Sequence, residues 1–132
     1  MSLKPYHLSL FTACLLLTGC AFNLVSVKQV PTTCTAVTGT PENFVLCAEV
    51  KAKLGTSFPT HLKAGTRWHQ VGETEYGAVF VTPDQIVAVE ASHIYEAQLV
   101  VSNRVITGFY LPVEKTFAPV THPISIETKT AN

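Results

Sequence analysis

The sequence predicts an α+β, mainly β domain: a small curled antiparallel sheet or half-barrel with one N-terminal α-helix. From Thr66 onward, Val, Ile, Thr and aromatic residues dominate, and turn residues recur every eight to twelve positions, which is typical of a sheet of short strands. Before that point, residues 41–54 carry apolar side chains at the three- and four-residue spacing of an amphipathic helix. A helix packed on one curled sheet is the simplest architecture that buries both patterns.

The start of the chain forms a segment of its own. Lys4 precedes a mostly apolar run, Leu8–Leu17, and Thr18-Gly19-Cys20 follows it. A helix needs ~20 apolar residues to cross the hydrocarbon core of a bilayer, so this run is too short to span one. Its length and its charged start match the apolar region of a secretory signal peptide.

The motif Leu17-Thr18-Gly19-Cys20 resembles the lipobox of bacterial lipoproteins. In that family the chain is cut before the cysteine, whose thiol and new amino group receive acyl chains, palmitate among them. The resemblance implies a signal peptide at residues 1–19, lipidation of Cys20 and a membrane anchor in the cell envelope. Several acyl chains on one residue hold a protein far more firmly than a single chain does.

Ala21 follows the cysteine, where in this family an aspartate favours retention in the inner membrane. The resemblance therefore implies the outer membrane, with the domain facing the periplasm, and a surface-exposed orientation stays open. The alternative interpretation of the first twenty residues is a buried N-terminal helix with an incidental cysteine.

Removal of residues 1–19 leaves 113 residues, which is the size of one domain. Eight Lys and Arg then face nine Asp and Glu, and the basic residues form no run. This composition excludes the basic surface that nucleic-acid binding needs. The expected partners are the membrane, through Cys20, and an envelope protein.

The cysteines differ in their expected fates. Cys14 leaves with the signal peptide, and Cys20 is the lipidation site. Cys34 and Cys47 remain as an even pair in an oxidising compartment, which predicts a structural disulfide. A redox or metal role is the alternative, but the spacing of thirteen residues fits neither Cys-x-x-Cys nor a close zinc-ligand pair.

Residues 20–39 are predicted to be a lipidated tether with a candidate entry strand at 23–30. Residues 40–128 form the domain, and residues 129–132 form a polar tail. The helix is expected at 41–54, where Thr40 can cap it and Gly55 can end it. Cys47, on the buried face, would then tie this helix to Cys34. A strand from Phe44 to Val50 stays open.

Six strands are predicted: Arg67–Gly72, Ala78–Thr82, Ile86–Glu90, Ile94–Val101, Val105–Leu111 and Ile124–Thr128. A helix over 83–97 competes with two of them, because Thr82 and Gln85 match a capping box. Asn103 tolerates the positive φ of a turn before the fifth strand. Gly108 inside that strand indicates a bulge or the close approach of another backbone.

No catalytic motif stands out, and neither a cofactor nor a metal is predicted. His61, His69, His93 and His122 are scattered along the chain. Adjacent Ser92 and His93 would point to opposite faces of a strand, and no Gly-x-Ser-x-Gly elbow is present. Glu73 and Glu75 share a strand face, as paired glycosidase carboxylates could, but a loop edge is their expected setting.

The contact surface for a partner is expected at Phe109, Tyr110, Leu111 and Pro112, where large apolar groups crowd a strand end. A core role for the aromatic residues, Trp68 and Phe117 among them, is the competing interpretation. The predicted function is that of a non-catalytic accessory lipoprotein that holds a protein partner at the outer membrane, in part through open strand edges. The alternative is a module that binds a small ligand or inhibits an envelope enzyme, and an envelope hydrolase is third.

Overall fold

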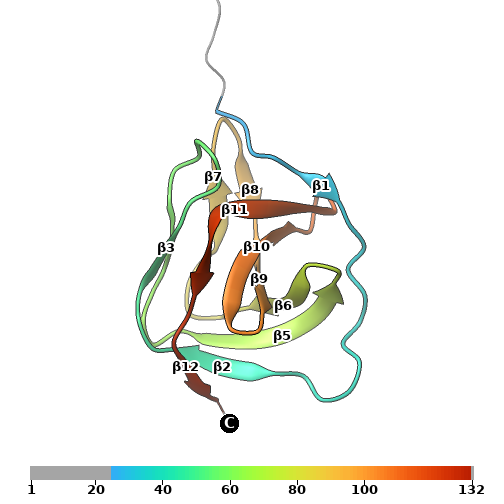
Figure 1. Ribbon diagram of the computed structural model, residues 1–132, viewed down its shortest axis with the longest axis vertical. Coiled ribbons are helices and arrows are strands. Elements are labelled where there is room, and N and C mark those ends of the chain that lie inside the picture. The colour runs from blue at the N-terminus through green and yellow to red at the C-terminus, as the bar shows by residue number, and fades with distance from the viewer. Residues whose placement is uncertain (1–24, 132) are drawn as a thin grey trace, which may run out of the picture.

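The structure is a computed structural model that describes residues 25–131 (Figure 1). The predicted signal peptide, Cys20 and the first part of the predicted tether lie outside the described residues. Over the described range the regular structure is all β, in twelve strands: β1 Val30–Pro31, β2 Asn43–Leu46, β3 Val50–Ala52, β4 Thr60–Leu62, β5 Arg67–Thr74, β6 Gly77–Val81, β7 Ala88–Glu90, β8 Ile94–Glu96, β9 Gln98–Ser102, β10 Val105–Leu111, β11 Thr116–Ser125 and β12 Thr128–Thr130. Within that range no helix is long and apolar enough to cross a membrane.

The predicted helix at 41–54 is wrong, and with it the α+β class. This segment forms β2 and β3, because its buried side chains recur every second residue: Phe44, Leu46, Val50, Ala52 and Leu54. The helical spacing depended on Cys47 and Ala48, which are both exposed. The burial of side chains in this segment therefore follows the two-residue period of a strand, not the 3.6-residue period of a helix.

The central sheet closes on itself. Its strand order is β1-β11-β10-β9-β6-β5-β2-β12, and all its neighbours are antiparallel. Only Ile126 and Glu127 separate β11 from β12, so the chain leaves one side of the sheet and reaches the other almost at once. The pairing of β12 with β2 joins both sides into a ring, visible in Figure 1.

Two hairpins stand on this ring. β3 pairs with β4, and β7 pairs with β8. An isolated bridge between Phe58 and Glu90 connects the two hairpins. The strand interpretation of 83–97 is therefore right for β7 and β8, and the competing helix is absent from the described chain.

The strand prediction is most accurate in the β9–β10 hairpin. β10 has the predicted bounds, and its turn carries Asn103 and Arg104 at φ 51° and 60°, the two positive angles of a type I′ turn. The register shifts between Ile106 and Gly108, so the bulge is confirmed. The prediction fails at β11, a ten-residue strand of which only the end was expected.

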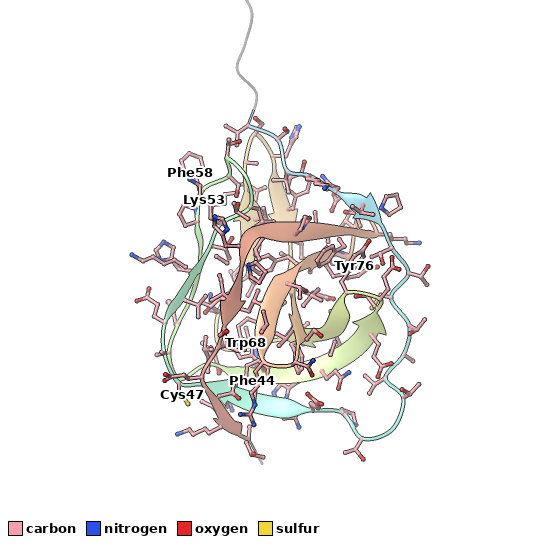
Figure 2. All side chains as sticks on the ribbon, in the orientation of Figure 1. Phe44, Cys47, Lys53, Phe58, Trp68 and Tyr76 are labelled. Carbon is pink, nitrogen blue, oxygen red and sulfur yellow. The ribbon has the colours of Figure 1, made fainter. Side chains whose placement is uncertain are left out.

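The inner face of the ring holds the main core. Trp68, Phe80 and Phe109 are fully buried there. Phe44 packs on Trp68 at a ring distance of 6.3 Å and meets Phe80 edge-on at 4.9 Å (Figure 2). The Trp68 Nε1–H donates to Thr66 Oγ1 at 2.8 Å, so the buried indole nitrogen has a partner.

A second, smaller cluster lies on the outer face, under the N-terminal segment. It consists of Val79, Val100, Tyr110 and Phe117, with Cys34 and Tyr76 against them. Tyr76 stacks on Phe117 with ring centroids 4.0 Å apart (Figure 2). Residues 30–38, part of the expected tether, thus cover one outer face of the sheet.

Candidate functional site

The end of the ring where β12 meets β2 is hollow. The register Thr130↔Phe44 fixes one wall, and the β9–β10 turn forms the other. The Ile126 amide donates to the Arg104 carbonyl at 3.0 Å, which connects that turn to the segment leading into β12. The hollow has a volume of about 650 Å³.

This end pocket combines an apolar floor with a charged rim. Phe44, Phe80 and Val101 contribute to its lining, as do the cationic residues Arg104 and Lys129. The acidic residue of the lining is Glu42, whose amide donates to Gln70 Oε1 at 3.0 Å. The residues of the lining thus carry more positive than negative charge, and an arginine can bind a carboxylate through two parallel hydrogen bonds. The volume lies in the range of small-molecule sites.

The opposite end carries the start of the described chain. The Val25 amide donates to Ser92 Oγ at 2.8 Å, and the Ser92 amide donates to the Val25 carbonyl at 2.9 Å. Ser92 lies at the tip of the β7–β8 hairpin, so the chain enters the domain there. Figure 1 shows this tip and β12 at opposite ends of the molecule.

The contact surface expected at residues 109–112 is wrong. Phe109 and Leu111 are fully buried inside the ring, and Tyr110 is 8% exposed under the N-terminal segment. Pro112 is half-buried, and it directly follows β10. The competing interpretation, in which the aromatic residues build the core, is the one that the structure supports, because both faces of β10 are covered.

The disulfide expected between Cys34 and Cys47 is not present, and both are free thiols. Cys34 lies on the outer face of the sheet, where its Sγ faces the Cα of Gly72. Cys47 is exposed just beyond β2 (Figure 2). The prediction depended on an even pair of cysteines in an oxidising compartment, a pattern that does not show whether the two thiols meet in the fold. Burial raises the pKa of the Cys34 thiol, although a hydrogen bond to the Glu73 backbone partly opposes this.

The polar segment Glu90–Glu96 forms the β7–β8 tip and brings no catalytic triad together in the described chain. Ser92 Oγ accepts the hydrogen bond from Val25, and the His93 ring lies edge-on to Tyr95 at 6.3 Å. Glu90 pairs with Ile94 across the hairpin. The serine thus has a structural role, in fixing where the chain enters.

Three further titratable candidates, Glu73, His61 and His69, are also engaged in structural contacts. The Glu73 carboxylate accepts hydrogen bonds from the Thr38 amide at 3.3 Å and from Thr38 Oγ1 at 3.2 Å. His61 lies 3.4 Å from Glu49, and His69 lies 3.1 Å from Asn43 Oδ1. No group of three or more potential metal ligands occurs among residues 25–131.

Loop 82–87 is held by two polar side chains. Asp84 accepts hydrogen bonds from the Arg67 amide at 2.7 Å and from its guanidinium at 2.6 Å, and these bonds lower the pKa of Asp84 from 3.8 to about 2. Gln85 accepts from the Lys63 amide and donates to the His61 carbonyl, both at 2.8 Å. These contacts fasten the loop to β4 and β5.

The residues of the end pocket were not expected from the sequence. From the sequence, Arg104 only follows Asn103 in the predicted turn, Lys129 belongs to the predicted polar tail, and Glu42 lies near the start of the predicted helix. No local signal connects them, since they meet only when β12 closes the ring. Comparisons with protein-family models, with curated protein sequences and with solved structures found no match to this chain.

Proposed function

We propose that this chain is a non-catalytic lipoprotein of the bacterial outer membrane that holds a protein partner in the periplasm. The anchor is Cys20, and the partner binds at the end pocket through an acidic side chain or a terminal carboxylate. One observation carries the proposal: the chain enters the domain at the β7–β8 tip, whereas the end pocket opens at the opposite end. A domain anchored at the tip presents the end pocket away from the membrane.

Strand addition at an open edge, considered from the sequence, loses its support. The end strands of the central sheet are β1, which is two residues long and contains Pro31, and β12, which is three residues long. Proline removes a backbone donor, and short edges resist pairing with another chain. The partner contact is therefore expected to involve side chains at the end pocket.

The test is crosslinking in living cells, with a photoreactive amino acid at Thr130 on the pocket rim. We expect one specific protein adduct, which Arg104→Glu combined with Lys129→Glu abolishes. Lys51→Glu, an exposed charge reversal on β3, is the matched control and should leave the adduct unchanged. An adduct that survives the double reversal would refute the role of the pocket. Cys20→Ser should leave the chain unprocessed or soluble, and unchanged membrane partition would refute the anchor.

A second candidate function is the binding of a small anionic ligand in the same pocket, which its volume favours. Native mass spectrometry of the purified protein distinguishes the two. A bound small molecule that the same double reversal releases, without any protein adduct in cells, supports the ligand-binding alternative.

A further inference from the structure

The exposed apolar side chains at the β7–β8 end form a small patch. Phe58 is 61% exposed and Ile94 is 75% exposed. Both lie beside Glu90, since Phe58 bridges to it from one side and Ile94 pairs with it from the other. Directly opposed residues of neighbouring strands point to the same face, so Phe58 and Ile94 project outward from one surface. We name these two residues the apolar tip.

Ile86 extends this apolar surface along the hairpin. It is 93% exposed, and with Phe58 it lines a hollow of about 570 Å³. Figure 2 shows Phe58 projecting outward at the end where the described chain begins. Large exposed apolar side chains that gather in one place indicate a contact with another apolar phase.

The chain length outside the structure limits how far the apolar tip can be from a lipidated Cys20. Two hydrogen bonds hold Val25 against Ser92, one donated by the Val25 amide and one accepted by the Val25 carbonyl. Ile94 is two residues beyond Ser92. The chain from Cys20 to Val25 can span at most about 18 Å, whatever its conformation. An acylated Cys20 sits at the membrane boundary. Val25 and the β7–β8 tip, to which Val25 is hydrogen-bonded, therefore stay close to that boundary.

We propose that Phe58 and Ile94 enter the interfacial layer of the membrane that holds Cys20. The proposal rests on the proposed function, because it needs the acylated cysteine. Apolar side chains of interfacial proteins reach ~5–10 Å into the boundary between headgroups and acyl chains. The insertion fixes the orientation of a domain that the acyl chains alone would leave free to rotate, with the end pocket directed outward.

The charges around the tip favour zwitterionic rather than anionic lipid. Glu90 and Glu96 are exposed on this hairpin, and exposed Lys53, which lies near Phe58 in Figure 2, adds one positive charge beside them. Electrostatic binding to anionic lipid needs several Lys or Arg residues, and the hairpin from β7 to β8 contains none. The carboxylates can remain at headgroup level while Phe58 and Ile94 enter the layer below.

The experiment uses the full chain, processed in bacteria, purified in detergent and reconstituted into phosphatidylethanolamine vesicles that contain a phosphatidylcholine with brominated acyl chains. Tryptophan is introduced as Phe58→Trp or, separately, Ile94→Trp. Val71→Trp is the matched control, because Val71 is 46% exposed but lies on β5, toward the other end of the molecule (Figure 1). Trp68 is fully buried and contributes the same background to each variant.

We expect bromination to quench the two tip variants at least about twofold more than Val71→Trp, since an interfacial indole lies close to the acyl chains. Equal quenching of all three tryptophan variants would overturn the proposed insertion of the apolar tip but not the anchor. This outcome counts only for protein that floats with the vesicles and carries acylated Cys20. Absence of the acyl group on Cys20 overturns both proposals. Emission that shifts with protein density but not with bromination indicates a second copy on the tip, and this too overturns the membrane contact.

Discussion

The two faces of the central strands are both apolar, but they are covered in different ways. The inner face is sealed by the ring itself, with Phe80 and Phe109 facing other strands. The outer face is sealed by residues 30–38, a mostly irregular segment held by Thr35 and Thr38 against Glu73. The inner layer is thus closed by many strand pairings, and the outer layer by a few hydrogen bonds. We expect the two layers to differ in how easily they open.

The largest effect is expected in the inner layer. Phe109→Ala leaves a cavity between fully buried side chains, so the free energy of unfolding should fall by ~3–5 kcal/mol. Chemical denaturation followed by circular dichroism measures this loss. Phe58→Ala, at an exposed position, is the control and should change stability little. A loss under about 1 kcal/mol for Phe109→Ala would contradict the ring as the main source of stability.

The next effect concerns the contact between β10 and β11. A Cβ at Gly108 would lie 2.7 Å from Cζ of Phe117 and would also meet the Ala118 carbonyl. Gly108→Ala therefore forces β11 away from β10 and displaces the Phe117 ring, at a cost of ~1–3 kcal/mol. Thermal unfolding measures the change. Gly39→Ala is the comparison, because Gly39 has open space around it but a positive φ of 82°. The stability that this variant loses therefore reports backbone strain alone.

A smaller effect is expected where the N-terminal segment is fastened. Glu73→Gln replaces the carboxylate that accepts the Thr38 hydrogen bonds, at a cost of under about 1.5 kcal/mol. The sensitive measurement is alkylation of Cys34, since its half-buried thiol with a raised pKa reacts when the outer layer opens. We expect faster labelling of Cys34 in this variant and unchanged labelling of exposed Cys47. If wild-type Cys34 and Cys47 both resist alkylation until a reductant is added, the two thiols are not free and form the disulfide that the sequence predicted.

The smallest effect belongs to a contact outside both layers. The pKa of Asp84 is lowered in the folded protein, so its ion pair with Arg67 stabilises the fold fully above pH ~4 and loses that effect as the pH falls toward 2. Asp84→Asn should reduce the melting temperature slightly at neutral pH and flatten its decline between pH 4 and 2. Melting curves across this range measure both. Glu114→Gln, in the exposed β10–β11 turn, is the control.

The sequence predicted local features well because they depend on neighbours along the chain. The β10 bounds, the turn at Asn103 and the bulge at Gly108 all follow from residue-specific backbone preferences. β11 was missed because Pro119 and Pro123 argue against a strand. The structure accommodates both, since β1 pairs only with Thr116 and Phe117 and requires no hydrogen-bond donor from either proline.

The helix error and the missed pocket share a different cause. Residues 41–54 fit a period of two and, less well, a period near 3.6, and only the burial of Leu46 and Ala52 distinguishes the two. The end pocket depends on β12 reaching β2, a contact between segments more than eighty residues apart. Spacing along the chain carries no information about such a contact, so neither Arg104 nor Lys129 could be recognised as lining residues.

The pairing of β12 with β2 also sets the order in which the protein can mature. The strand that completes the ring is the last of the described chain, so a nascent polypeptide that lacks β12 holds β2 with one edge unpaired. Non-local strand pairing is slow, and an unpaired edge invites association with other chains. The free edge of β2 therefore stays unpaired until β12 arrives, and the same late step makes completion of the ring coincide with formation of the end pocket.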